Sequence, residues 1–443
     1  MTARQRNFLF AGAMFIAFAA AAYKISSLAP PAAYAVQTVQ ISRVAQSPEV
    51  DATPVFTSQF VSSVPGKAVH APSLVELQDG SLRTVWFSGS REGAGDVTIQ
   101  TAVFDTINQQ WGPERSLFDR AQLQGGLWRY VKKIGNPVIA RAPDGSLHLW
   151  MVNVSLGGWA GSAITWSRSV DDGSTWSQPK RLVTSPFLNI STLVKAAPVA
   201  MANGELSLPV YHEFITKFAE VLRIDAKGRV LDKVRIAGSH TSLQPVVLAS
   251  SGLTAQALMR ATQGGQVMHS TTQDAGQTWS ETTPIASPNP NSALAGAVLH
   301  DGSLWLALNP TTSGREKLAL IRLGDEGDKT NKTNKTNKLL VVEPPTQNKK
   351  LSNPLSRDAY AAVLGEELKS KGALDTDVAA YVTSAQKQLC TGASCVQEFS
   401  YPFVLQSHDG TLHLVYTWHR TRIKHVQLEL SSSSANRTKA KNP

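Results

Sequence analysis

Six short hairpin motifs recur along the chain, and they limit its fold more than any other feature. Each motif joins two apolar segments through a turn that contains glycine, as in "VELQDGSLRTVW" and "AVLHDGSLWLAL". An Asp-Gly or Asn-Gly pair between apolar segments is typical of a β-hairpin. The six turn glycines are Gly80, Gly145, Gly204, Gly252, Gly302 and Gly410.

The spacing of these turns predicts the architecture. Successive turn glycines are roughly 50 to 65 residues apart, enough for one four-stranded antiparallel sheet, whereas the last interval is roughly 110 residues long. We therefore predict an all-β fold, a six-bladed β-propeller over residues 61–430, with an insertion at 329–397 before the last blade. The insertion begins with the run "KTNKTNKTNK" and continues into a segment of helical composition.

Two similar corners, "SVDDGSTW" and "TQDAGQTW", stand between the hairpin motifs. In each corner an aspartate, Asp171 or Asp274, can accept backbone hydrogen bonds, and the glycine that follows can take a positive φ. The tryptophan then re-enters the next strand and buries its ring. We predict that both corners are outer turns, remote from any pocket on the propeller axis.

The composition is that of a globular chain with ample core: 443 residues, 42% hydrophobic and 17% charged. The net charge of +10 would favour anionic partners, but part of it lies in the lysine-rich insertion and the tail. No basic stripe with interleaved aromatic residues is present, so we predict no nucleic-acid partner. The histidines show no metal-ligand spacing, and we predict no metal, no cofactor and a monomeric chain.

The N-terminal region predicts export. Arg4 and Arg6 precede an uncharged apolar run at 8–23, and no acidic residue occurs before Glu49. Residues 1–28 are therefore either a signal peptide, cleaved near the "AYA" at 33–35, or a retained inner-membrane anchor. Both alternatives place the remaining chain in the periplasm or at the cell surface.

Three smaller segments complete the predicted organisation. Residues 29–60 form a linker and a closing outer strand, and the polar, basic tail at 431–443 is predicted to be disordered. Cys390 and Cys395 are close enough for one small disulfide loop, although a free pair fits the sequence equally well.

Two sets of polar residues are predicted to line a pocket on the propeller axis, because the inner strands of all blades begin around that axis. The first set stands where the inner strands begin: His70, Asn136, Lys195, Gln244 and Tyr401. The second set stands at the other ends of the hairpins: Arg91, Glu92, Glu213, Arg260, Asn309 and Arg315. Arginines bind carboxylates in a bidentate manner, so Arg260 and Arg315 predict an acidic ligand.

The two aspartate corners and the phased hairpins resemble the sialidase superfamily over roughly residues 61–429. In the similar segment "YPFVLQSHDGTLHLVY", the resemblance implies that Tyr401 is a tyrosine nucleophile. It also implies that Arg260 and Arg315 are the second and third members of an arginine triad, and that Asp96 is the acid/base residue.

The chain departs from the family pattern at two positions. The first arginine of the triad belongs to an Arg-Ile-Pro motif, but this chain has "VHAP", with His70 in the arginine's place. Gln244 stands where the family has a glutamate that polarises the tyrosine, although Glu213 can approach from the adjoining blade.

Three functions of different class fit these residues. The resemblance favours an exo-acting glycoside hydrolase that uses Tyr401 and Asp96 on an acidic sugar. One alternative is a uronate polysaccharide lyase, in which His70 and Tyr401 act as base and acid. The other is a non-catalytic, glycan-binding propeller.

Overall fold

The computed structural model describes residues 2–26, 30–36, 55–61, 63–185, 189–323, 339–343 and 354–429. These residues form six antiparallel sheets of four or five strands each, and one small three-stranded sheet. The repetitive run at 329–338 and the tail at 431–443 lie outside the described residues. The described part is therefore mostly β-structure, as the sequence predicts.

The six larger sheets follow one another along the chain, each with its innermost strand first. The first sheet contains β2 (Ala68–Glu76), β3 (Leu82–Gly89), β4 (Thr98–Asp105), β5 (Gln110–Trp111) and β6 (Arg115–Phe118). The second contains β7 (Lys133–Arg141), β8 (Leu147–Val154), β9 (Ser162–Ser169) and β10 (Lys180–Arg181). The third contains β11 (Thr192–Val194), β12 (Val199–Ala200), β13 (Leu206–Glu213), β14 (Lys217–Ile224) and β15 (Val230–Arg235).

The remaining three sheets repeat the same antiparallel order. The fourth contains β16 (Ser242–Ala249), β17 (Ala255–Ala261), β18 (Gly265–Thr272) and β19 (Thr283–Asn289). The fifth contains β20 (Ala295–Val298), β21 (Leu304–Leu308), β22 (Leu318–Leu323) and β23 (Leu339–Glu343). The sixth contains β27 (Phe399–Gln406), β28 (Leu412–Trp418), β29 (Arg422–Glu429) and, paired with β29 at its outer edge, β1 (Val55–Phe60).

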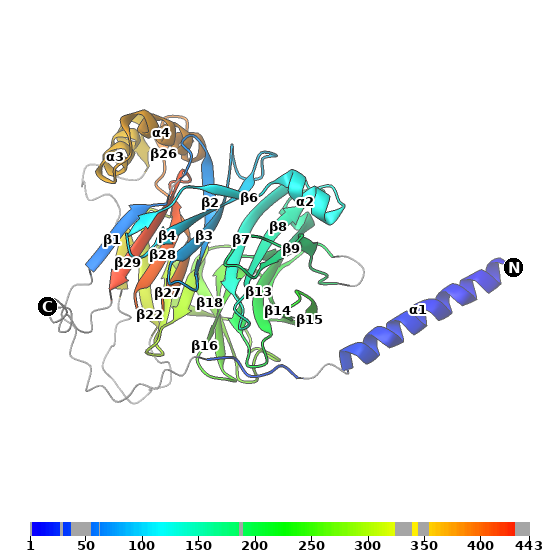
Figure 1. The fold of residues 1–443 in the computed structure, drawn as a ribbon. Helices are drawn as coiled ribbons and strands as arrows, with labels where there is room; N and C mark the ends of the chain where they lie inside the picture. Colours follow the sequence, from blue (N-terminus) through cyan, green and yellow to red (C-terminus); the bar gives the residue numbers. More distant parts are fainter. Residues whose placement is uncertain are drawn as a thin grey trace.

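The innermost strands of neighbouring sheets contact one another around the molecule. β2 contacts both β7 and β27, and β16 contacts both the third sheet and β20, which in turn contacts β27. Figure 1 shows the sheets arranged side by side in this way. The inner strands therefore begin at one common end of the molecule, which we call the start end.

Each of the six predicted glycine turns joins the first two strands of one sheet at the opposite end of the molecule. We call this end the turn end. The glycine has a positive φ in five of the six turns, where any other residue would be strained: Gly80, Gly145, Gly204, Gly302 and Gly410.

The two aspartate corners also lie at the turn end, each between the third and fourth strands of its sheet. Asp274 accepts hydrogen bonds from the backbone N–H of Thr278 at 2.9 Å and from the hydroxyl of Thr272 at 2.7 Å, and Asp171 makes the same set of contacts in its own corner. Trp279 follows and is buried. Both corners are thus outer turns.

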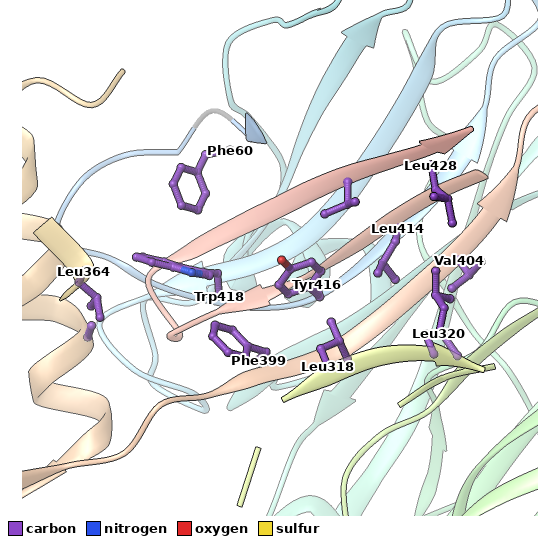
Figure 2. Close-up of a cluster of buried hydrophobic side chains, with 14 of the residues drawn as sticks. Phe60, Leu318, Leu320, Leu364, Phe399, Val404, Leu414, Tyr416, Trp418 and Leu428 are labelled. Carbon is purple, nitrogen blue, oxygen red and sulfur yellow. The ribbon is translucent and has the colours of Figure 1, made fainter. Parts of the chain in front are cut away.

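A helical insertion packs beside the sixth sheet near the start end (Figure 1). It contains α3 (Arg357–Ser370), α4 (Asp375–Leu389) and the small sheet of β24 (Leu355–Ser356), β25 (Cys390–Thr391) and β26 (Ser394–Cys395). Cys390 and Cys395 form a disulfide. Leu364 of α3 belongs to the same buried cluster as Phe399 and Trp418, which Figure 2 shows between the insertion and the sheets. The insertion therefore shares the core of the last two sheets.

The N-terminal region contains the helix α1 (Ala3–Ser26). Two short helices lie in connections next to strands of the second sheet: α2 (Arg120–Leu127) before β7, and a 3₁₀ turn (Trp159–Gly161) between β8 and β9. Within the described residues, no helix is long and apolar enough to cross a membrane. The predicted signal peptide and anchor remain predictions.

The segment at 30–36 lies across the turn end, along the bottom of the view in Figure 1. Tyr34 is 3% exposed and packs in a core cluster with Met201 and Trp279. Its backbone N–H donates to the carbonyl of Gly252 at 2.7 Å, and Ala35 donates to Ala200 at 2.8 Å. The segment 30–36, which contains the "AYA" sequence, therefore acts as a strap that joins the third and fourth sheets.

Candidate functional site

Four inner strands carry a strained residue at the start end. Each of these residues precedes a proline, has a positive φ and lies at a register shift between the first two strands of its sheet. They are Ala71 (φ 55°), Asn136 (φ 40°), Gln244 (φ 53°) and Tyr401 (φ 53°). Positive φ at residues with side chains costs free energy and persists mainly at functional sites. The repeat of this strain at equivalent positions makes the start end the candidate functional site.

Tyr401 stands at the centre of a cluster of predicted site residues. The Gln244 side-chain amide donates a hydrogen bond to the Tyr401 hydroxyl at 3.1 Å. The ring of His70 lies 4.2 Å from the ring of Tyr401, measured between centroids. The Lys195 Nζ lies 5.6 Å from the Tyr401 ring and donates to the Pro402 carbonyl at 3.1 Å. Three of the predicted residues, His70, Lys195 and Gln244, thus surround the phenol of a fourth, Tyr401.

Burial determines the charge of two groups in this cluster. His70 is 4% exposed, and burial together with the positive charges of Arg420 and Arg315 lowers its pKa well below the usual value. Its Nδ1 has no hydrogen-bond partner among the described residues. Burial also lowers the pKa of Lys195 to about 7. The imidazole is therefore neutral at neutral pH.

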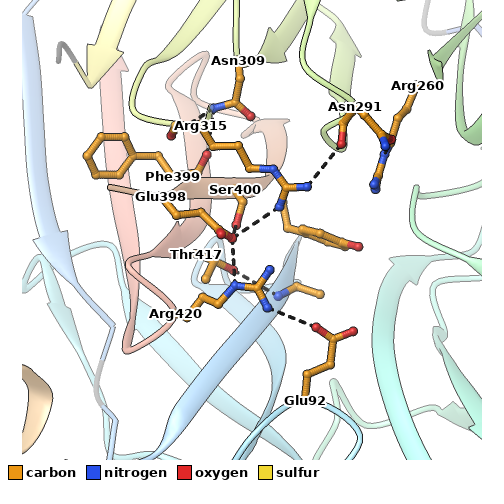
Figure 3. A network of polar contacts seen from close by, with 12 residues as sticks. Glu92, Arg260, Asn291, Asn309, Arg315, Glu398, Phe399, Ser400, Thr417 and Arg420 are labelled. Atoms are coloured by element: carbon orange, nitrogen blue, oxygen red, sulfur yellow. Dashed lines mark hydrogen bonds and ion pairs between the residues drawn. The ribbon is translucent and has the colours of Figure 1, made fainter. Parts of the chain in front are cut away.

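A wall of arginines and carboxylates (Figure 3) is connected to Tyr401 through Gln244, which contacts both Arg260 and Tyr401. Arg260 donates to the Gln244 side-chain oxygen at 3.1 Å and also to the side chain of Asn291. Arg315 donates to the Asn291 carbonyl at 3.2 Å and forms an ion pair with Glu398 at 3.4 Å. The two predicted arginines are thus joined through one asparagine.

Glu398 connects this wall to a further arginine that the sequence analysis did not identify. Arg420 donates to Glu398 at 3.0 Å and to Glu92 at 3.2 Å. Glu398 also accepts from the hydroxyl of Ser400 at 2.6 Å. Figure 3 shows Glu398 between Arg315 and Arg420, with Glu92 on the far side of Arg420.

Three further polar side chains form the opposite part of the cluster. The hydroxyl of Tyr211, which is 2% exposed, accepts from Asn136 at 3.3 Å and from Gln244 at 3.4 Å. Glu213 lies two residues further along β13 and therefore faces the same side as Tyr211. Burial raises the pKa of Glu213, opposed by the charges of Lys217 and Arg260.

Two other predicted site residues, Asp96 and Arg91, have no contact with Tyr401 among those that the described residues make. Asp96 accepts hydrogen bonds from the backbone and hydroxyl of Ser90, at 2.9 Å each, and lies 4.0 Å from the Lys67 Nζ. Burial alone would raise the pKa of Asp96, but the hydrogen bonds from Ser90 and the charge of Lys67 lower it below the usual value. Arg91 is exposed at the loop surface. The roles of both residues remain predictions.

Asn309 supports the backbone of the wall. It is 0% exposed, and its amide donates to the carbonyls of Lys317 at 2.7 Å and Phe399 at 2.9 Å. Both donor hydrogens therefore have partners. These contacts hold the Arg315 loop against β27, and the substrate-binding role of Asn309 remains a prediction.

The residues that sequence reasoning missed are Tyr211, Asn291, Glu398 and Arg420. Arg420 lies beyond the end of β28, in "YTWHR", whereas Arg260 lies within β17, in "ALMRAT". The repeat phase that identified Arg260 therefore does not reach Arg420. Asn291 and Glu398 lie in connections between sheets, where the hairpin phase predicts nothing.

In the described part of the chain, no group of three or more His, Cys, Asp or Glu side chains could hold a metal ion. The site is instead a set of arginines, three carboxylates, a phenol, an imidazole and a lysine. This set can bind a carboxylate, move a proton and supply an oxygen nucleophile.

A model of the BNR repeat-like domain family matches residues 80–414, which is more than half of the chain. The chain belongs to this family. Its members include the sialidase-like BNR propellers, which agrees with the resemblance seen in the sequence. A comparison with curated proteins finds no match.

Several solved structures share the fold of this BNR repeat-like protein. The Hadza microbial sialidase Hz136 is 17% identical, with a TM-score of 0.59, and the match covers 82% of this chain and 66% of the sialidase. The intramolecular trans-sialidase from Ruminococcus gnavus is 12% identical, with a TM-score of 0.56, and the match covers 82% of this chain and 94% of the enzyme. The Penicillium chrysogenum alpha-L-arabinanase is 13% identical, with a TM-score of 0.52, covering 85% of this chain and 98% of the enzyme.

This chain therefore spans slightly less than two thirds of the length of the first of these structures. At these identities the likeness shows the fold, which several kinds of glycoside hydrolase use.

Proposed function

We propose that this chain is an exo-acting glycoside hydrolase of the sialidase superfamily, built as a six-bladed propeller, that cleaves an acidic sugar from a glycan. The observation that supports this most is the Tyr401 cluster, in which Gln244 contacts the hydroxyl and His70 contacts the ring beside a wall of arginines. A phenol nucleophile suits such a substrate, because a carboxylate nucleophile would repel the carboxylate of the sugar.

The chain's own residues can activate the phenol without the glutamate that the family pattern contains. The Gln244 amide donates to the Tyr401 oxygen, which stabilises negative charge there. The phenol proton passes to solvent as the oxygen attacks, and the ring of His70 packs against the tyrosine ring. The Tyr401 oxygen then bonds to the anomeric carbon while the bond from that carbon to the glycosidic oxygen breaks.

The leaving glycosidic oxygen needs a proton, and two carboxyl groups compete for this role. Asp96 has a lowered pKa and is therefore ionised at neutral pH, which suits a base better than an acid. Burial raises the pKa of Glu213, which faces the same side of β13 as Tyr211. We therefore assign proton donation to Glu213. Water then attacks the anomeric carbon and gives a proton to the Glu213 carboxylate, while the bond from that carbon to the Tyr401 oxygen breaks and releases the sugar.

The same His70 and Tyr401 pair supports a second candidate function, uronate lyase. The arginines would neutralise the uronate carboxylate and so acidify the neighbouring C–H bond. Neutral His70 would remove that proton, and the Tyr401 hydroxyl would protonate the leaving oxygen. The elimination leaves a carbon–carbon double bond in the sugar.

Product analysis tests both functions. The purified chain is incubated with aryl sialosides, aryl uronides and uronate polymers. A hydrolase releases a saturated sugar, a lyase releases an unsaturated product that absorbs in the ultraviolet, and a non-catalytic propeller retains a glycan without any product. Only release of a saturated acidic sugar supports the main proposal.

Substitution of the nucleophile provides the matched test. Tyr401→Phe removes only the phenol oxygen, so turnover should fall by about 1,000-fold or more while the sugar still binds. Tyr130→Phe is the control, because Tyr130 is 57% exposed and contacts none of the cluster residues described above. Normal turnover in Tyr401→Phe would contradict the mechanism.

We further propose that the protein acts outside the cytoplasm on acidic glycans or glycoconjugates. Arg4 and Arg6 before an apolar run support export, and the disulfide of Cys390 with Cys395 suits an oxidising compartment. Cell fractionation with an antibody to the chain tests this proposal, and recovery with cytoplasmic proteins would contradict it.

A further inference from the structure

Lys195 is a buried lysine without a carboxylate partner. Its side chain is 3% exposed, and its Nζ bonds, among the described residues, to the carbonyl of Pro402 alone. A buried ammonium group without a counter-charge costs free energy, and such groups are common at functional sites. The steps proposed above for the hydrolase do not use this group.

The hydrogen bond of Lys195 stabilises the backbone of the candidate nucleophile. Tyr401 has a φ of 53°, and the register between β27 and β28 shifts across Tyr401 and Pro402. The Pro402 carbonyl therefore lies outside the regular ladder, and Lys195 supplies a donor for it from the third sheet, 207 residues away in the sequence. Lys195 thus holds the strained backbone of Tyr401 in one conformation.

The same ammonium group lies over the face of the Tyr401 ring. Its Nζ is 5.6 Å from the centroid of the Tyr401 ring and 5.9 Å from the centroid of the Phe403 ring. A cation in this position attracts the ring, and it stabilises the negative charge that develops on the phenol oxygen during attack. The effect depends on the proton of Lys195, because the neutral amine offers no charge.

Other ionisable groups face this cluster from the neighbouring strands and loops. They are His70, Tyr211, Glu213, Arg260, Arg315, Arg420 and, in the cavity that Lys195 also lines, His300. Burial keeps the pKa of His70 well below and the pKa of Tyr211 well above the usual values, so both stay neutral near pH 7. The arginines keep their charge, two of them paired with Glu398. Burial lowers the pKa of Lys195 to about 7, so Lys195 changes its charge in this range.

We propose that Lys195 is a positioning residue for Tyr401, which fixes the backbone of the tyrosine and, while protonated, increases the reactivity of its phenol oxygen. This proposal rests on the proposed function, because it assigns Lys195 to the attack by Tyr401. Burial favours the neutral amine, so the contribution of Lys195 is present below about pH 7 and is lost as the pH rises through that value.

Acetylation of tyrosines by N-acetylimidazole tests the reactivity of the phenol without any sugar. The acetyl group passes to the phenol oxygen and imidazole leaves. The full chain is treated between about pH 6 and pH 8.5, and peptide mass spectrometry gives the rate at Tyr401 and at Tyr130, an exposed reference in the same chain. The ratio of the Tyr401 rate to the Tyr130 rate should fall about 10-fold as the pH rises through 7. A ratio that does not change with pH would overturn the proposal.

Two substitutions of Lys195 separate its charge from its packing. Lys195→Arg keeps a positive charge over the whole range, so the ratio should stay high above pH 7. Lys195→Met removes the charge and the donor, so the ratio should be low at every pH. A fall in Lys195→Arg as large as in the wild type would overturn the proposal, because another group would then be titrating.

Control variants identify the titrating group even if neither Lys195 variant folds, which thermal melting shows. Glu213→Gln and His300→Asn each remove a different ionisable group and should keep the fall, because Lys195 remains. Loss of the fall in either variant would overturn the proposal. Lys133→Met is the matched control for a lysine over a ring, since the Lys133 Nζ lies 5.7 Å from the ring of Trp159. It should leave the wild-type pattern unchanged.

Turnover measurements separate this proposal from the proposed function. With the aryl glycoside that the wild type hydrolyses, Lys195→Met should lower kcat about 10- to 100-fold at pH 6 and change KM by less than about 3-fold. The ratio of kcat in Lys195→Arg to kcat in the wild type should rise as the pH rises through 7, because only the wild type loses its charge. If the wild type releases no sugar at any pH, the proposed function fails and the role of Lys195 fails with it. If sugar is released and this ratio of kcat values is independent of pH, only the role of Lys195 is overturned.

Discussion

The two ends of the same inner strands treat positive φ in opposite ways. At the turn end the residue with positive φ is glycine in five of the six hairpins, including Gly80 and Gly145. At the start end the residues with positive φ carry side chains, among them Asn136, Gln244 and Tyr401. In these inner hairpins the chain uses glycine where it only turns, although the aspartate corners at the same end also hold Asp172 and Ala275 at positive φ. The contrast is therefore a property of the inner strands.

The hydrogen bonds of the aspartate corner are shorter in range than those of the candidate site, although other bonds at the turn end also join distant segments, such as that from the His408 N–H to Glu76 across 332 residues. At the turn end Asp274 bonds to residues two and four positions away. At the start end Gln244 bonds to Tyr401 across 157 residues, and Arg420 bonds to Glu92 across 328 residues. Changes at the turn end should therefore alter stability and leave ligand binding unchanged. The predictions below test this division, from the largest expected effect to the smallest.

The largest effect is expected at Tyr34 in the N-terminal strap. Tyr34→Ala should lower the free energy of unfolding by about 3–5 kcal/mol, because a large buried ring is lost from a packed cluster. Urea denaturation measures this loss. Tyr34→Phe is the control and should stay within about 1 kcal/mol of wild type, since it keeps the ring.

The strap also bears on processing of the N-terminus. A cut after Ala35 would remove Tyr34 and its backbone bond to Gly252, whereas a cut after residue 28 would keep both. A chain that begins at residue 29 should therefore melt like the full chain, and one that begins at residue 37 should melt at a clearly lower temperature. Equal melting temperatures would show that the strap contributes nothing.

A pH-dependent effect is expected at a buried histidine pair near the turn end. The His413 Nδ1 lies 3.0 Å from the His425 Nε2, and burial lowers the pKa of His413 to about 4, opposed by Asp409. Between pH 6.5 and 4 the unfolded chain binds a proton at this residue and the folded chain does not. The free energy of unfolding therefore falls as the pH falls through this window, by roughly 2–3 kcal/mol for His413. Above pH 7, His413 makes no pH-dependent contribution.

Comparison with a variant isolates this contribution, because other buried histidines such as His148 titrate in the same window. The free energy of unfolding is measured at pH 7 and pH 4.5 for wild type and for His413→Asn. The difference between the two pH values should be smaller in the variant. An identical pH dependence would mean that His413 already holds its proton in the folded chain.

The fold could be predicted from the sequence because the turn end is local. Gly80 and its counterparts identify a hairpin within a dozen residues, and the insertion was visible as a lengthened interval before Gly410. The strap could not be predicted, because the apolar residues around Tyr34 have no periodic pattern and their partners are far away in sequence.

The candidate site was predicted only in part. The spacing of the hairpin repeat grouped His70, Gln244 and Tyr401 in one predicted site. The structure places His70 and Gln244 in contact with Tyr401. The strand register, however, makes Ala71 and not His70 the equivalent of Gln244. Glu398 is paired with arginines from two different sheets, and no local pattern carries that information.

A smaller effect is expected for the aspartate corner. Asp274→Ala removes the acceptor for the Thr278 backbone N–H and for two hydroxyl groups, and it should lower the free energy of unfolding by about 1–2 kcal/mol. Asp274→Asn keeps one acceptor oxygen and should lose less. Binding of an acidic sugar, measured by titration, should be unchanged in both variants. A weaker affinity for the sugar in either variant would contradict the expectation that the turn end affects stability and not ligand binding.

The smallest effects come from a reciprocal pair of substitutions that tests the contrast in positive φ directly. Gly80 has a φ of 80° and open space where a Cβ would stand, so Gly80→Ala should lower the free energy of unfolding by about 1 kcal/mol through backbone strain alone. Asn136→Gly makes the opposite change at the start end. It relieves the strain at φ 40° and loses one hydrogen bond to Tyr211, so its stability should stay within about 0.5 kcal/mol of wild type. Sugar binding should weaken only in Asn136→Gly. If Asn136→Gly is the less stable variant and binds normally, the strain at the start end serves structure and not a ligand.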